Sequence, residues 1–216
     1  MKKTFVTAIL VACATLFSSC GDNFMQGLFE LISGNATSTI GDNETYEYTS
    51  CIVMVSDLDT MPFTLGLAMS INVENLTNLK GPEDLSYPFL VFRVADTLQT
   101  EQTYTVNNIL TEEDLENFDY QWLINGRFAN DHIVGVAESD SVFYIMSTGT
   151  INIAKKTDTK VEGSYAGMAY VINRNAVPML SSEQVAFSGT FTSRATPMMS
   201  WLMLLQEQWQ QEVAEN

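Results

Sequence analysis

The sequence predicts an all-β protein: an antiparallel β-sandwich or β-barrel of about nine or ten strands, with a short N-terminal helix and a C-terminal amphipathic helix. Three observations lead to this prediction. From residue 46 onward, apolar residues alternate with polar or small ones, which is the two-residue period of half-buried strands. Turn-forming residues interrupt that pattern roughly every 8–12 residues. A period of three to four residues occurs only near the two ends of the chain.

Length and composition fit one domain with short appendages. The chain has 216 residues, of which 46% are hydrophobic and 11% aromatic, so it can form a packed core. It carries 26 acidic and 10 basic residues, a formal net charge of −16. Such a surface repels a phosphate backbone, and no cluster of Lys and Arg offsets it. We therefore expect no nucleic-acid partner.

The first 19 residues have the three parts of a secretory signal peptide. Lys2 and Lys3 precede an uncharged, mostly apolar run at 4–17, and small residues follow directly before Cys20. The run is shorter than the roughly 20 residues that a spanning helix needs. We therefore expect residues 1–19 to be removed and the mature chain to have no transmembrane helix.

Cys20, directly after Phe17-Ser18-Ser19, resembles the lipobox of bacterial lipoproteins. The resemblance implies that Cys20 becomes the new N-terminus and carries fatty acyl chains such as palmitate, although Phe17 replaces the usual Leu. Each buried CH₂ group adds about 0.8 kcal/mol of membrane affinity, so two or three chains anchor the protein stably. Gly21 and Asp22 resemble the signal for outer-membrane sorting. An ordinary signal peptide with an incidental cysteine is the alternative.

Residues 20–45 are expected to join the lipid to the folded domain. Apolar residues in 24–33 fall on one helical face, which predicts a short amphipathic helix that ends at Gly34. Residues 34–45 are rich in Gly, Asn and Thr and are predicted to form a tether or loop.

The predicted β domain spans residues 46–195. Its clearest alternation comprises Phe63, Leu65, Leu67, Met69, Ile71 and Val73. Further strands are expected in 46–57, 87–95, 102–108, 132–138 and 141–148. Between them, 111–118 predicts a capped helical turn and Asn125-Gly126 a hairpin. Cys51, in an apolar strand without a basic neighbour, is interpreted as a small buried hydrophobic residue.

The last third of the domain has the most regular pattern. Ile151 and Ile153 share one face, a polar turn covers 155–160, and two alternating strands follow. The alternating residues of these two strands are Val161, Gly163, Tyr165, Gly167, Ala169 and Val171, then Val185, Phe187, Gly189 and Phe191.

The order of parts in 141–192 ("GTINI", a polar turn, "VEGSYAG", a loop, "VAFSGTF") resembles a recurring type of Bacteroidetes lipoprotein. The resemblance covers about a quarter of the chain and rests on glycines and alternating apolar residues. It implies a β-sandwich or calycin-like barrel domain. Most proteins of that type have no assigned activity.

The segment 196–216 predicts the C-terminal helix. Thr196 is a suitable N-cap and Pro197 a suitable first helical residue. Apolar residues then recur at helical spacing: Met198, Trp201, Leu202, Leu205 and Trp209. Three placements remain open: capping of the β domain, docking on a partner protein, or membrane insertion, which the acidic tail disfavours.

The sequence contains no catalytic motif, and we expect neither an enzyme nor a bound cofactor or metal. His132 is the only histidine, and Ser164 lies in a predicted strand rather than in a nucleophile motif. Asp57 and Asp59 lack the third ligand and the glycine of a calcium loop. A pair of carboxylates for glycoside hydrolysis stays open, because such residues can be distant in sequence.

Three sites match the Asp-Ser/Thr-apolar pattern that resembles the O-glycosylation acceptor of secreted Bacteroidetes proteins. The acceptors would be Thr60, Thr97 and Ser141. Asp-Ser and Asp-Thr pairs are also common in turns, which is the alternative.

Together these patterns predict an exported protein, anchored to the outer membrane through Cys20 on its periplasmic or cell-surface side. Its non-catalytic β domain would bind a glycan or an envelope protein. The candidate contact residues are any exposed aromatics among Tyr120, Trp122, Phe143 and Tyr144, although packing in the core is the main expectation for each of them. The alternatives are a structural or assembly component that uses the C-terminal helix, and a small glycan-active hydrolase.

Overall fold

The computed structural model describes residues 34–42, 44–55, 64–70, 87–96, 98–110, 114–115 and 132–197, with side chains as far as Arg194. In these ranges the chain forms ten strands joined into one sheet. They are β1 (Gly34–Ile40), β2 (Glu44–Tyr48), β3 (Ser50–Val55), β4 (Thr64–Met69), β5 (Phe89–Val94), β6 (Gln102–Asn107), β7 (Ile133–Ala137), β8 (Val142–Lys156), β9 (Val161–Asn173) and β10 (Leu180–Pro197). The predicted all-β class is confirmed.

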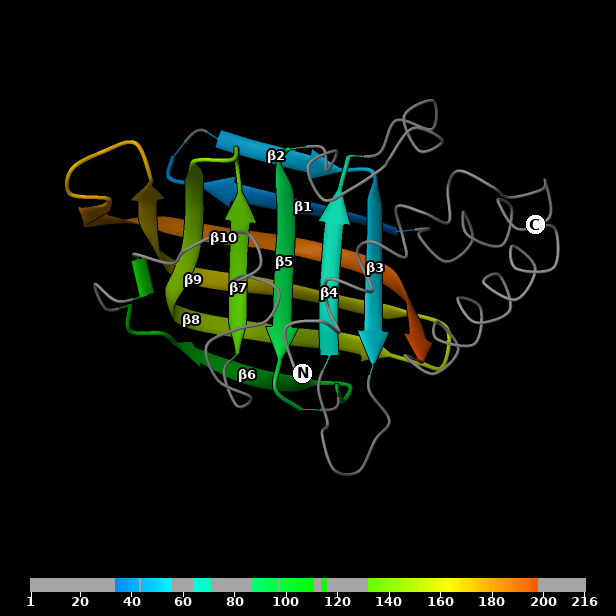
Figure 1. Cartoon of the computed structure of the whole chain (residues 1–216). Helices are drawn as coiled ribbons and strands as arrows, with labels where there is room; N and C mark the ends of the chain where they lie inside the picture. Colours follow the sequence, from blue (N-terminus) through cyan, green and yellow to red (C-terminus); the bar gives the residue numbers. More distant parts are fainter. Residues whose placement is uncertain are drawn as a thin grey trace, which may run out of the picture.

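The sheet folds into two layers that cross each other. In Figure 1, β3, β4, β5 and β7 run side by side in front, and β2, β1, β10, β9, β8 and β6 cross behind them. Facing layers of this kind bury the inward side chains of both.

Two long strands join the layers and close the sheet. The first part of β8 pairs with β7 in the front layer, and its residues 148–153 pair with β6 in the back layer. Strand β10 pairs with β9 and β1, and its last residues, 194–197, then pair with β3 in parallel. The other pairings among the described strands are antiparallel. The pairing therefore runs from β3 through β4, β5, β7, β8, β9 and β10 and back to β3.

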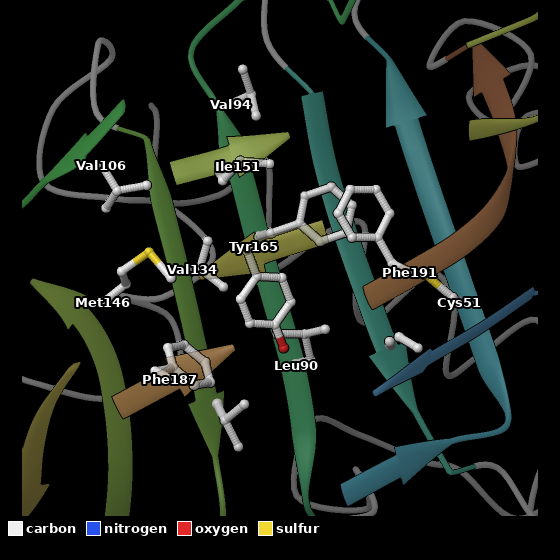
Figure 2. Packing of buried hydrophobic residues seen from close by; sticks show 14 of the residues in the cluster. Cys51, Leu90, Val94, Val106, Val134, Met146, Ile151, Tyr165, Phe187 and Phe191 are labelled. Carbon is white, nitrogen blue, oxygen red and sulfur yellow. The ribbon is translucent and has the colours of Figure 1, made fainter. Parts of the chain in front are cut away.

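Side chains from both layers fill the space between them. Figure 2 shows Tyr165, Phe187 and Phe191 of the back layer facing Leu90 and Val134 of the front layer. The rings of Phe92 and Phe191 stack with centroids 4.2 Å apart, across the two layers. The predicted inward faces of β9 and β10 are confirmed, because Tyr165, Phe187 and Phe191 are each about 1% exposed.

Three polar side chains inside this core form hydrogen bonds, whereas the buried hydroxyl of Tyr48 has no such partner in the described part of the chain. The hydroxyls of Ser38 and Tyr165 lie 2.5 Å apart, and Tyr165 donates to the carbonyl oxygen of Thr37 at 3.0 Å. The Ser193 hydroxyl donates to the carbonyl oxygen of Cys51 at 2.7 Å. These bonds avoid the cost of about 1–3 kcal/mol for each buried group left unsatisfied.

Glycines make room for the large rings. A Cβ atom on Gly66 would overlap the ring of Phe92, and one on Gly163 would overlap the ring of Phe191. Gly66 and Gly163 therefore belong to opposite layers but accommodate the same aromatic stack.

The front layer is buried on both of its faces, and this corrects one expectation. In β5, Leu90 and Phe92 face the interior, yet the outward Phe89 and Val91 are also fully buried. In β4 the small inward residues pair with the inward side of β5, and Leu67 pairs with the outward Val91. Leu65, Leu67 and Met69, the described part of the alternation in 63–73, therefore lie on the outer face of this layer, whereas the apolar side of a half-buried strand was expected to face the core.

Three other boundaries differ from the sequence-based expectations. Residues 34–40, predicted as part of a tether, form β1 because they pair along their whole length with β10. The two strands expected at 141–153 are one continuous strand, β8. Thr196 and Pro197, expected to begin the C-terminal helix, end β10 instead, because they pair with β3.

The remaining predicted elements fall mostly outside the described ranges. This applies to the helices at 24–33 and beyond 197 and to the Asn125-Gly126 hairpin. Of the predicted turn at 111–118, only residues 114–115 are described, and they are helical.

The close packing of the Phe92 ring against Gly66 yields a stability prediction. Replacing Gly66 with Ala pushes a methyl group against Phe92, and overpacking of this kind costs about 1–3 kcal/mol of unfolding free energy. Urea unfolding of the Gly66→Ala variant measures this loss. Ala166→Ser, on an exposed position of β9, is the control and should unfold as the parent does. Equal stability of parent and Gly66→Ala would show that the Phe92 ring is not packed against this glycine.

Candidate functional site

Two glutamates and two tyrosines converge at one end of the gap between the layers. Glu44 and Tyr46 come from the start of β2, Glu138 directly follows β7, and Tyr144 lies near the start of β8. In Figure 1 the adjoining ends of β7 and β8 lie beside the start of β2. We call these four residues the Tyr–Glu cluster.

The β7–β8 turn fixes one half of the cluster. The amide of Glu138 donates to the carbonyl oxygen of Val142 at 2.9 Å. The Ser139 hydroxyl accepts hydrogen bonds from the amides of Ser141 and Val142 at 3.3 and 3.0 Å. Such side chain–backbone bonds are typical of tight turns rich in Ser and Asp. The turn thereby holds Glu138 next to β8.

Hydrogen bonds connect the phenols to the carboxylates. The Tyr144 hydroxyl donates to Glu138 Oε2 at 2.8 Å, and the Tyr46 hydroxyl lies 3.4 Å from Glu44 Oε2. Tyr144 is 9% exposed, Tyr46 and Glu138 are half-buried, and Glu44 is exposed. Glu44 is therefore open to solvent, Tyr46 and Glu138 are partly accessible, and Tyr144 donates to Glu138 from within.

The carboxylates also change the acidity of the phenols. Burial, followed by the negative charges of Glu138 and Glu44, raises the pKa of Tyr46 to about 12. Burial, followed by the hydrogen bond and charge of Glu138, raises the pKa of Tyr144 well above its usual range. Both phenols are therefore protonated donors at neutral pH, and both carboxylates offer free acceptor lone pairs. This set suits a ligand rich in hydroxyl groups.

Ser141 is the one predicted O-glycosylation acceptor within the described residues. It is half-buried in the β7–β8 turn, three residues after Glu138, and its hydroxyl lies 3.4 Å from that of Ser139. Thr60, Thr97 and the lipid attachment residue Cys20 lie outside the described ranges. All four modifications stay predictions.

Cys51 is a buried core residue, as predicted. Its side chain is 1% exposed and forms no disulfide, and burial raises the pKa of its thiol to about 12. A thiol in this state is neither a nucleophile nor a metal ligand at neutral pH.

His132 has a structural role at the start of β7. Its Nδ1 atom accepts the amide of Ala95 at 3.1 Å, and its ring meets Tyr104 edge-on with centroids 5.5 Å apart. Nearby, Asn108 Nδ2 donates to the carbonyl oxygens of His132 and Met146 at 3.1 and 3.0 Å. Ser164, as predicted, lies within a strand, β9.

Of the four aromatic contact candidates, two are described, and both are buried. Phe143 is 1% and Tyr144 is 9% exposed, so both have the core placement that was the main expectation for them, and neither ring is available as a surface contact. Tyr120 and Trp122 fall outside the described ranges. Among the described residues, no group of three or more His, Cys, Asp or Glu side chains is placed to hold a metal ion. The same part of the chain contains no helix long and apolar enough to cross a membrane.

The sequence did not indicate the Tyr–Glu cluster as a site. Glu44 and Glu138 are far apart in the chain, and only Tyr144 drew attention, as a possible surface aromatic. The sequence contains only a weak clue. Glu44 and Tyr46 are two residues apart, so in a short strand their side chains lie on the same face. Their proximity to Glu138 depends on the path of β1 and β2 across the back layer.

Comparison of the chain with known proteins gives no match: no family model, no curated protein and no solved structure is similar to it.

Glu138 yields a titration prediction. In the Glu138→Gln variant the pKa values of Tyr46 and Tyr144 should fall, because a neutral amide no longer opposes formation of a phenolate. Titration of phenolate absorbance measures this change. Glu183→Gln, at an exposed position of β10, should titrate like the parent. An unchanged curve for Glu138→Gln would contradict the cluster.

The same groups determine how the stability of the fold changes as the pH rises into the alkaline range. The pKa of Tyr46 is about 12 in the fold against 10.0 for an unperturbed phenol, so the folded state binds this proton more tightly. Its contribution to stability is complete below pH 10.0 and is lost as the pH rises toward 12. The Glu138→Gln variant should therefore lose less stability over that interval than the parent.

Proposed function

We propose that this chain is a lipid-anchored cell-envelope protein whose β domain binds a glycan without chemically altering it. The observation that carries the proposal is the convergence of Glu44, Tyr46, Glu138 and Tyr144 at one end of the sheet, where Glu44 is exposed. The leader sequence and Cys20 support the anchor and outer-membrane location.

The chemistry of the cluster favours a hydroxyl-rich ligand. Charged acceptors form stronger hydrogen bonds than neutral ones, and Glu44 and Glu138 present such acceptors to the hydroxyl groups of a sugar. Tyr46 adds a phenol donor and an aromatic face. The net charge of −16 disfavours acidic glycans, so the proposed ligand is neutral.

Side chains fill the space between the layers, and this supports ligand binding at the margin of the sheet instead of between its layers. A ligand carried between the layers would have to displace the stacked rings of Phe92 and Phe191. Glu44, by contrast, is already exposed, and Tyr46 lies at the margin of the core.

A glycan screen tests the binding function. The mature chain from residue 20, with Cys20→Ser to keep it soluble, is titrated calorimetrically with neutral and acidic oligosaccharides. We expect binding to a neutral member of the panel and at least tenfold weaker binding by Glu138→Gln, since one lost hydrogen bond to a charged group costs about 1.5–3 kcal/mol. Tyr46→Phe removes a neutral donor and should weaken binding by about 0.5–1.5 kcal/mol. Glu183→Gln and Tyr170→Phe are matched controls that should bind as the parent does.

Other outcomes would select the alternative functions. Release of reducing sugar by the parent, lost in Glu44→Gln and Glu138→Gln, would make the chain a glycan-active hydrolase. Absence of glycan binding, combined with capture of one envelope protein that requires residues 198–216, would make it an assembly component. Either result would contradict the proposal.

The lipid anchor has its own test. In Cys20→Ser the precursor should remain uncleaved and should not incorporate labelled palmitate, because the acylated sulfur is absent. Cys13→Ser, within the leader, is the matched control and should be labelled and processed normally. Normal labelling and membrane retention of Cys20→Ser would refute acylation at this residue.

A further inference from the structure

Basic residues gather at one end of the back layer, around the turn between β8 and β9. The described part of the chain contains six basic residues, and four of them lie there: Lys155, Lys156, Lys160 and Arg194. Arg194 belongs to this group because the residue before it, Ser193, pairs with Val161 at the start of β9. Three of the four side chains are exposed, and that of Lys156 is half-buried. We call these four residues the basic end.

The bases outnumber the acids among the described residues at this end. The acids there are Glu101, Asp158 and Glu162. Glu162 pairs in register with Lys155 and forms an ion pair with Lys160. Glu101 is included because its neighbour Thr100 donates to the carbonyl oxygen of Lys156 at 3.0 Å. The described residues of this end therefore carry a small positive charge, although the chain as a whole has a net charge of −16.

The opposite end of the back layer is acidic. The end of β9 lies beside the β7–β8 turn, because the amide of Arg174 donates to the carbonyl oxygen of Ser141 at 2.9 Å. Arg174 is the one basic residue described at this end, against five acids: Asp42, Glu44, Glu138, Asp140 and Glu183. The 13 residues of β9 place its two ends about 40 Å apart. Because salt screens charges beyond about 8 Å, the acids of one end do not cancel the bases of the other.

The folded domain begins at its basic end. Gly34, the first residue of β1, pairs with Ser193, which on its other side pairs with Val161. Two strand spacings separate Gly34 from Val161, roughly 10 Å. In Figure 1 the start of β1 and the β8–β9 turn lie at the same side of the molecule. Residues 21–33 alone join Gly34 to Cys20, so a lipid on Cys20 would hold the basic end nearer to the membrane than the acidic end.

We propose that the basic end docks on the phosphate groups of the anionic lipids that surround the anchor. Ammonium and guanidinium groups form strong, charge-assisted hydrogen bonds to phosphate oxygens. Each basic side chain near an anionic membrane surface strengthens binding by about fivefold. The lipid already keeps the chain at the surface, so the basic end has only to orient it. The proposal rests on the proposed function in taking Cys20 as the anchor, and it directs the Tyr–Glu cluster away from the membrane.

Acetylation of the lysines on vesicles tests the docking. The mature chain, produced without its leader, is coupled through the Cys20 thiol to a maleimide lipid. Cys51 does not compete, because it is buried and burial raises the pKa of its thiol to about 12. The vesicles contain phosphatidylcholine alone or with phosphatidylglycerol. A neutral acetylating reagent is added, and mass spectrometry gives the acetylation rates of Lys155, Lys156 and Lys160.

We expect acetylation to be slower on phosphatidylglycerol vesicles by a factor of about five or more, the gain from one basic side chain near such a surface. In 1 M salt, where the screening length is about 3 Å, the two rates should become equal. Combining Lys155→Gln with Lys160→Gln should remove most of the protection of Lys156. Asn175→Lys, in the exposed β9–β10 turn, is the control, and its amine should react equally fast on both vesicles.

The remaining outcomes contradict the proposal in different ways. Equal rates for the three native lysines on both vesicles would show that the basic end does not dock. Protection of the Asn175→Lys amine instead would show that the acidic end faces the membrane. Protection that is present in the uncoupled chain and is lost on dilution would make the basic end an interface between two copies. Because the coupling needs no acylation in the cell, a failed palmitate test would refute the anchor of the proposed function without changing these rates.

Discussion

The whole architecture depends on two strands that each belong to both layers. Strand β8 pairs with β7 at its start and with β6 farther along, and the end of β10 pairs with β3. Because both strands also pair with β9, the sheet has no free edge between its layers at these corners. The closure confines the inward side chains, and those side chains must then fill a fixed space.

The limited space between the layers explains why aromatic rings stack there and why glycines lie beside those rings. Phe92 comes from the front layer and Phe191 from the back, and their rings meet only because Gly66 and Gly163 have no side chains in the way. Because side chains fill the interior, the proposed ligand site lies at its margin. The Tyr–Glu cluster lies at one end of the layers.

The sequence predicted those parts of the fold in which one face is buried and the other is solvated. In β9 and β10, Tyr165 and Phe187 point inward between outward Ser and Ala residues, so alternation locates the core correctly. In β4 it does not, because both sides of the front layer are buried, and the small Gly66 is the residue that faces Phe92. Strand β1 has the composition of a loop because its inward residues, such as Ala36 and Ser38, are small. Its pairing with β10 is a long-range contact that no local pattern reveals.

The candidate sites were predictable to different degrees for the same reason. Cys51 could be assigned to the core because its own neighbours are apolar. Glu44 and Glu138 meet only through the path of the sheet, so neither attracts attention in the sequence.

Closure of the sheet by β10 is the central claim, and amide hydrogen exchange in the mature chain tests it most directly. We predict that the amides through which residues 194–197 of β10 pair with β3 exchange as slowly as those in the β9–β10 pairing, because both would open only with global unfolding. Rapid exchange of β3 and the end of β10, with protection retained in β9, would show that the layers are not closed at this corner and would contradict the account.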